Sequence, residues 1–172
     1  FRRLNTGGVK LNPQELRNAL YPGFFNEALQ ELAKEPTFAD LWGIPHSENT
    51  TPNEISAKLA RNTLYQSMMD CELVLRFFAI RDACSGMASG SLRQIFDKTM
   101  RRYSLLSESE VQRLKDEFRA VLHLVTDSLG PAFHHLSNGR PSRPLYDAIL
   151  VAAIDFQDAN FKNNASAIKS EF

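Results

Sequence analysis

The sequence predicts a mainly α-helical protein, built as a bundle of about six to seven helices. Apolar residues recur at helical spacing in several long stretches between residues 13 and 156. Capping residues precede some of these stretches, and breaker pairs such as Pro22-Gly23 and Gly130-Pro131 separate them. The chain has 172 residues, 43% hydrophobic with 12 phenylalanines, which is enough to bury one sizeable core.

The first helix is expected from Pro13 to about Tyr21. Asn12 can cap it, Pro13 suits the first helical position, and Glu15 lies where a capping box needs a carboxylate. The residues expected on its inward face are Leu16, Ala19 and Leu20. A second short helix follows Pro22-Gly23 and ends at Pro36.

A small apolar cluster over residues 38–42 and a polar loop over residues 43–53 come next. From about Glu54 to Ala83 the pattern predicts one helix, whose all-round hydrophobicity indicates burial on most faces. Within it, Glu72 and Arg76 lie four residues apart in the favourable order for a helical ion pair. We interpret this pair as structural, at the edge of the core, rather than as part of a site.

Three further helices are expected in the second half of the chain. One begins at Ser91 and runs to Tyr103. Another opens with a Ser107–Glu110 capping box and ends at Gly130-Pro131. The last covers residues 145–156, after a turn-rich stretch that follows two adjacent histidines. The expected organisation is a glycine loop over 1–12, a helical unit over 13–156 and a polar tail over 157–172.

Lysine plus arginine equals aspartate plus glutamate at 20 each, so any attraction to nucleic acid must come from local patches. Two patches could contact a DNA backbone, and their residues are Lys98, Arg101, Arg102, Arg140 and Arg143. The alternative interpretation is an ordinary solvated face. No apolar run is long enough for a membrane span, and no secretory signal pattern opens the chain.

The first stretch suggests an anion site. Gly7 and Gly8 allow positive φ angles and a close approach of backbone N–H groups to a ligand, and the loop leads into the first helix. The basic residues that surround this loop are Arg2, Arg3, Lys10 and Arg17. An ordinary turn is the competing interpretation, because glycine pairs often precede helices.

The same stretch carries a family resemblance. The residues concerned are Phe1, Arg3, Leu4, Asn5, Gly8, Leu11, Glu15, Leu16 and Arg17. They resemble the F-x-R-x-N-x-x-G-x-x-L-x-x-x-E-L segment of the DUF262 family, ParB/sulfiredoxin-like domains of the GmrS component of the GmrSD modification-dependent restriction endonuclease and of related phage-defence proteins. The stretch from Asp70 to Ala79 is similar to an E-L-V-L-R-F-F-A helix of one branch, and residues 129–133 and 145–152 resemble its closing helices.

This resemblance implies a function for a larger protein. The family's catalytic Asp-Gly-Gln-Gln-Arg motif precedes the matched segment and does not occur in this sequence, so we expect the chain to be the C-terminal part of an originally α/β protein. The whole protein would couple nucleotide binding or hydrolysis to cleavage of modified or foreign DNA, using an NTP with Mg²⁺. Arg3 would hold a phosphate, and Asn5 would orient this phosphate or a catalytic side chain. The Gly7 and Gly8 amides would donate hydrogen bonds to the ligand, and Arg17 would support these residues without contacting the ligand.

The resemblance also implies partners: the N-terminal half of the same protein, DNA, and a nuclease or a second copy of the chain, in the cytoplasm. For the fragment alone no catalytic residues or cofactor are evident. The histidines lack metal-ligand spacing, so a metal site is not expected, and the two cysteines are expected to be free and buried. A non-catalytic helical module that binds DNA backbone or a partner subunit is the main alternative, and a purely structural or dimerising bundle is the third.

Overall fold

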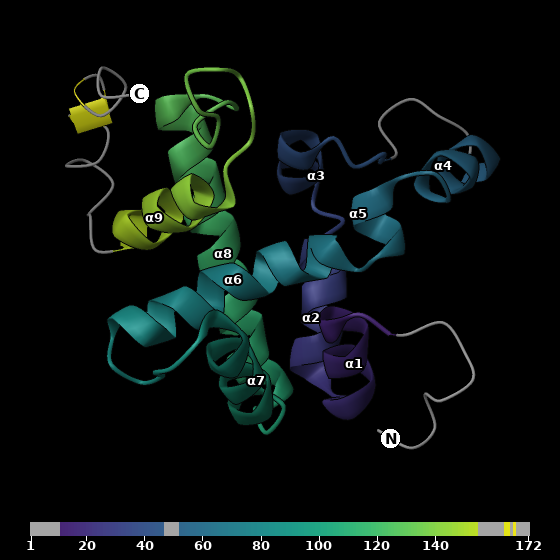
Figure 1. Ribbon diagram of the computed structural model, residues 1–172, viewed down its shortest axis with the longest axis vertical. Coiled ribbons are helices and arrows are strands. Elements are labelled where there is room, and N and C mark those ends of the chain that lie inside the picture. Colours follow the sequence, from purple (N-terminus) through teal and green to yellow (C-terminus); the bar gives the residue numbers. More distant parts are fainter. Residues whose placement is uncertain (1–10, 47–51, 155–163, 166, 168–172) are drawn as a thin grey trace.

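The computed structural model describes residues 11–46, 52–154, 164, 165 and 167 (Figure 1). Nine helices are formed by these residues, which contain no strand and one isolated β-bridge, between His135 and Pro141. The helices are α1 Pro13–Leu20, α2 Phe24–Leu32, α3 Pro36–Trp42, α4 Pro52–Leu59, α5 Thr63–Gln66, α6 Met69–Cys84, α7 Leu92–Tyr103, α8 Glu108–Leu129 and α9 Arg143–Ile154. The predicted mainly α-helical class is confirmed.

Helix starts follow the capping signals of the sequence. The Asn12 side chain accepts hydrogen bonds from the N–H groups of Gln14 and Glu15, and the Glu15 carboxylate accepts one from the Asn12 N–H. Ser107 and Glu110 form the same box at the start of α8, and Ser91 forms a third with Gln94 at α7. Each box satisfies N–H groups that the first turn leaves without partners.

The helix predicted over 54–83 is instead three helices. Asn62 starts α5 by accepting a hydrogen bond from the Tyr65 N–H at 3.0 Å, because its short amide can compete with helical backbone bonding. Met68 adopts a left-handed conformation, with φ of 51°, which separates α5 from α6. The cluster at 38–42 is also a helix, α3, with Glu35 as its cap and Pro36 in its first turn.

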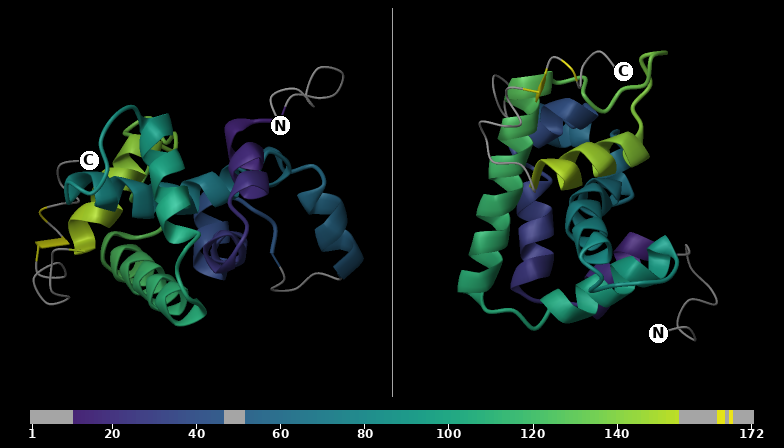
Figure 2. Two further views of the ribbon diagram at one scale, coloured as in Figure 1. Left: turned by 90° about the horizontal axis from the view of Figure 1, so that it is seen from below. Right: turned by 90° about the vertical axis from the view of Figure 1, so that its left-hand side faces the viewer.

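Helix α6 lies at the centre of the fold. It packs against α1, α2, α5, α7 and α9, and crosses the middle of the molecule in Figure 1. From Leu73 to Ala79 every residue is buried, as the all-round hydrophobicity predicted. Helices α2 and α8 stand side by side next to it (Figure 2). Most of the other helices are therefore packed around one apolar segment.

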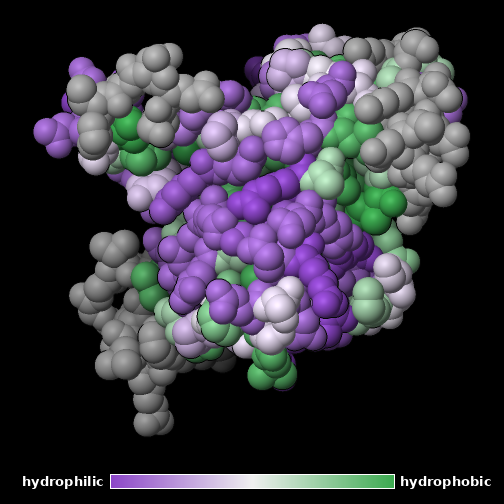
Figure 3. Space-filling model, turned by 180° about the vertical axis from the view of Figure 1, so that it is seen from behind, coloured by the Kyte–Doolittle hydropathy of each residue, from purple (hydrophilic) through white to green (hydrophobic). Residues whose placement is uncertain are grey.

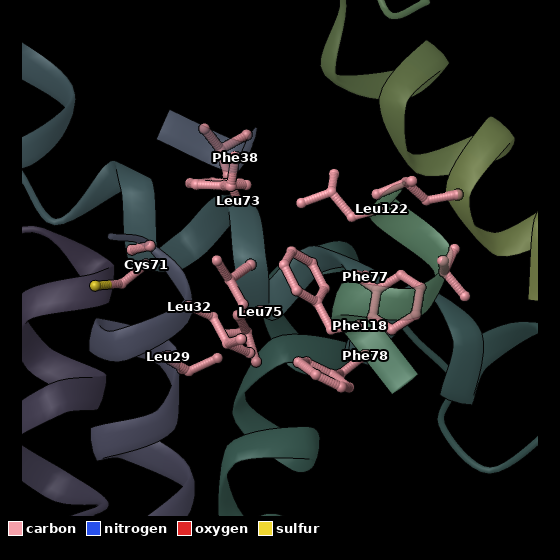
Figure 4. Packing of buried hydrophobic residues seen from close by; sticks show 14 of the residues in the cluster. Leu29, Leu32, Phe38, Cys71, Leu73, Leu75, Phe77, Phe78, Phe118 and Leu122 are labelled. Atoms are coloured by element: carbon pink, nitrogen blue, oxygen red, sulfur yellow. The ribbon is translucent and has the colours of Figure 1, made fainter. Parts of the chain in front are cut away.

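Aromatic rings fill the space between α6 and α8. Phe118 of α8 lies 5.3 Å from the Phe77 ring and 6.0 Å from the Phe78 ring, measured between centroids (Figure 4). Phe25 of α2 meets Phe78 edge-on at 5.4 Å. Such pairs add roughly 0.5–1.5 kcal/mol each beyond the area that they bury. This stack connects α2, α6 and α8.

The outer side of α8 is polar. The face seen in Figure 3 is largely hydrophilic, and α8 faces outward on that side. Lys115 and Arg119 of α8 pair with Glu31 of α2 at 2.5 and 2.7 Å. The apolar residues that recur at helical spacing along α8 therefore face the core, with Phe118 and Leu122 inside.

The inward face predicted for α1 is wrong. Ala19 and Leu20 are exposed and Leu16 is half-buried, whereas Gln14 and Arg17 are buried. The reason is that carboxylates of the neighbouring helices α6 and α7 face α1, so a charged side chain on this face finds partners that an apolar one would not.

We expect Phe118→Ala to lower the free energy of unfolding by about 3–5 kcal/mol, because it removes a fully buried ring from the stack. Leu105→Ala is a control, because Leu105 is 85% exposed and its truncation removes little buried area. Urea denaturation followed by circular dichroism measures both variants. A loss below about 1 kcal/mol for Phe118→Ala would contradict the packing described here.

Candidate functional site

The residues that the resemblance assigns to phosphate binding, Arg3, Asn5, Gly7 and Gly8, lie outside the described residues. The structure does describe the helix that directly follows them. Helix α1, together with the charged side chains that join α1 to α6 and α7 and that join α6 to α9, forms the candidate site. We call Arg17, Glu72, Arg76, Asp97 and Asp147 the charge cluster.

Arg17 is the contact between α1 and the core. Its Nη1 lies 3.1 Å from Oε2 of Glu72 on α6, and its Nε lies 2.8 Å from Oδ1 of Asp97 on α7. The Arg17 side chain is 4% exposed and that of Glu72 is 14% exposed. Ion pairs shielded from water in this way are strongly coupled, since removal of one partner leaves a buried charge. One guanidinium therefore joins three helices.

Arg76, one turn further along α6, forms its ion pair with a different helix, α9. It binds Asp147 of α9 through both Nε and Nη2, and Nε lies 2.9 Å from Oδ1. The predicted ion pair between Glu72 and Arg76 is therefore wrong. Each of these residues pairs with another helix instead, Glu72 with Arg17 of α1 and Arg76 with Asp147 of α9.

A phenylalanine lies between the two arginines. The guanidinium carbons of Arg17 and Arg76 lie 5.1 and 5.7 Å from the centroid of the Phe96 ring. Cations at this distance from an aromatic face are attracted by its quadrupole. Phe96 itself is buried, so it fixes both guanidinium groups without supplying charge.

The charges within the cluster nearly compensate one another. Its two arginines face three carboxylates. Burial raises the pKa of the Asp147 carboxyl, and the charges of Arg76 and Arg143 act in the opposite direction. Gln14 adds a carbonyl oxygen 3.4 Å from Arg17 Nη1. All five charged groups are occupied by one another, so the cluster is suited to holding helices in place and not to proton transfer or nucleophilic attack.

The basic residues predicted as DNA contacts are separated by the fold. Three of them, Lys98, Arg101 and Arg102, are on α7. Arg140 lies in the loop before α9, and Arg143 is the first residue of α9. Figure 1 shows these two regions near opposite ends of α8. A helix of 22 residues spans roughly 30 Å, so the two groups do not form one patch.

Two of these basic side chains have intramolecular partners. Arg102 forms an ion pair with Asp82, which is fully buried and also accepts a hydrogen bond from Tyr103 at 2.8 Å. Lys98 donates to the Ser89 carbonyl at 2.8 Å. Arg101 is exposed, and so are Arg140 and Arg143.

Histidine and cysteine form no metal-binding group in the described ranges. His134 is fully buried against Trp42, and burial together with His135 lowers its pKa to about 4. Cys71 is buried and free as predicted, but Cys84 is exposed because it is the last residue of α6. No helix within the described part of the chain is long and apolar enough to cross a membrane.

No protein-family model matches the sequence, and comparisons with curated proteins and with solved structures found no match.

Two members of the charge cluster, Asp97 and Asp147, were not predicted from the sequence. A signal for Asp147 was present, because it is the one acidic residue in the apolar stretch from Leu145 to Ile154. A lone carboxylate in such a stretch implies a buried cationic partner. Asp97 had no comparable signal, since α7 carries charges on several positions.

We expect Arg17→Met to lower the free energy of unfolding by about 3 kcal/mol, because Glu72 would lose its buried partner. Adding Glu72→Gln should restore part of the loss and give a coupling energy of about 1–3 kcal/mol in a double-mutant cycle. Lys115→Met at the surface pair with Glu31 is the control and should cost at most about 1 kcal/mol. Additive losses in the cycle would show that Arg17 and Glu72 do not depend on each other.

Proposed function

We propose that the chain is the helical C-terminal part of a DUF262-type protein that acts in nucleotide-dependent restriction of modified or foreign DNA in the cytoplasm. Its role is to hold the segment of residues 1–10 against the N-terminal half that carries the Asp-Gly-Gln-Gln-Arg motif. Arg3, Asn5, Gly7 and Gly8 contact phosphate in this proposal. When bound, an NTP with Mg²⁺ supplies the phosphoryl group that is hydrolysed.

The observation that supports the proposal most is the ion pair between Arg17 and Glu72. Arg17 belongs to the first stretch that resembles the family, and Glu72 belongs to the second, 55 residues later. The fold brings these two stretches into direct contact at 3.1 Å. A resemblance shared by segments that touch is more informative than one spread over unrelated surfaces.

The capped start of α1 supports the same role. Asn12 is held at its side chain by the capping box and donates from Nδ2 to the Ser67 carbonyl at 2.8 Å. Because Asn12 and Arg17 both tie α1 to the neighbourhood of α6, the end of the preceding segment has a fixed attachment point. A phosphate-binding loop needs such an anchor, since misplacement by about 1 Å can cost 10²-fold in rate.

The alternative function, a module that binds DNA backbone, has less support. Its five basic residues are divided between two regions, and Arg102 is engaged by Asp82. The exposed Arg101, Arg140 and Arg143 could each contact a phosphate, but isolated contacts supply only a small share of non-specific affinity.

In the full-length protein, Arg3→Ala should abolish nucleotide turnover with little loss of stability, because it removes the proposed phosphate contact. Arg101→Ala is the matched control, an exposed arginine on α7 whose loss should leave turnover unchanged. Phosphate release assays with ATP and GTP measure turnover, and thermal melts measure stability. Turnover that is unchanged in Arg3→Ala would remove Arg3 from the site.

The reading frame tests the family assignment independently. A coding sequence upstream of Phe1 that contains Asp-Gly-Gln-Gln-Arg would support the proposal. A reading frame that starts near Phe1 would overturn it, because the catalytic groups would then have no source.

A further inference from the structure

A pocket lies between α3, α4, α5 and the start of α6, beside the residues that follow α2. Its volume is about 180 Å³. The walls are largely apolar and are formed by Ala39, Ile44, Ile55 and Leu59. This is smaller than the roughly 300–1,000 Å³ of sites for drug-sized ligands, so it suits a molecule of a few heavy atoms. In Figure 1 the surrounding helices gather at the upper right.

The pocket has a carboxylate in its wall. Asp70, in the first turn of α6, is 4% exposed and lines the pocket. Its Oδ1 accepts a hydrogen bond from the Cys71 N–H at 2.8 Å. Within the described ranges it forms no ion pair, unlike the buried Asp82 and Asp147, which pair with arginines. A buried carboxylate without an ion-pair partner is costly, and a cation bound next to it would compensate it.

Two other side chains at the pocket act on a cationic ligand in opposite directions. Tyr65 of α5 lines the pocket and is 40% exposed, so its ring face can contact a cation. Lys34 also lines the pocket. Burial raises the pKa of Asp70, and the charge of Lys34 acts in the opposite direction. The imidazole of His46 is already bound to Asp40 at 2.7 Å. Lys34 is therefore the competitor of an entering cation.

We propose that this pocket binds an alkylammonium group, with its charge against Asp70 and Tyr65 and its carbon chain against the apolar walls. The group could belong to a small free amine or to a lysine side chain of another protein. This site is independent of the proposed nucleotide role, because it shares no residue with the charge cluster.

Binding is tested by calorimetric titration of the protein with n-butylammonium chloride and with Nα-acetyl-lysine methylamide. Neutral 1-butanol is the control ligand, since it keeps the carbon chain and removes the charge. We expect saturable binding of an ammonium probe and none of butanol. Tighter binding of butylammonium would identify a free amine, and tighter binding of the blocked lysine would identify a protein side chain. Equal binding of butanol, or no binding of either ammonium, would overturn the proposal.

Two variants with opposite expected effects test the geometry. Asp70→Asn keeps the shape and removes the charge, so affinity should fall roughly tenfold or more. Lys34→Gln removes the competing cation, so affinity should stay the same or rise. If Asp70→Asn does not fold, Tyr65→Leu at the exposed rim replaces it, with an expected loss of roughly threefold. Unchanged affinity in the Asp70 variant, or in Tyr65→Leu where it stands in, would also overturn the proposal.

Discussion

The fold depends on one constraint, the neutralisation of two charges carried by a helix that is covered on most of its faces. Glu72 and Arg76 lie one turn apart on α6, among residues that are completely buried. The side chain of Glu72 is 14% exposed and that of Arg76 is 9% exposed, so both charges are largely removed from water. Arg17 of α1 and Asp147 of α9 compensate them, so the placement of both outer helices follows from the charges of the central one.

Hydrophobic packing supplies the remaining restraint. The rings of Phe77, Phe78 and Phe118 fix α8 against α6, and this contact is not directional in the way that an ion pair is. Apolar burial thus stabilises the bundle, whereas the charge cluster specifies the position of α1. If residues 1–10 contact a phosphate as proposed, that specificity serves function, because α1 determines where the segment ends.

Much of the helical layout could be predicted from local signals. Asn12, Ser91 and Ser107 sit at helix starts, and the stripe of α8 faces the core as its spacing indicated. The partners of charged residues could not be predicted, because Glu72 is bound by a residue 55 positions away. The break at Met68 was missed for a similar reason: a left-handed residue other than glycine leaves no mark in a pattern of apolar spacing.

Native-state hydrogen exchange tests the central role of α6 most directly. Amides between Leu73 and Ala79 should exchange only through global unfolding, with a free energy of opening equal to that from denaturant titration. Those of α4, at the edge of the bundle, should open at lower free energy. Exchange of the α6 amides at a lower free energy than those of α8 would contradict the account, because the bundle would then persist without its central helix.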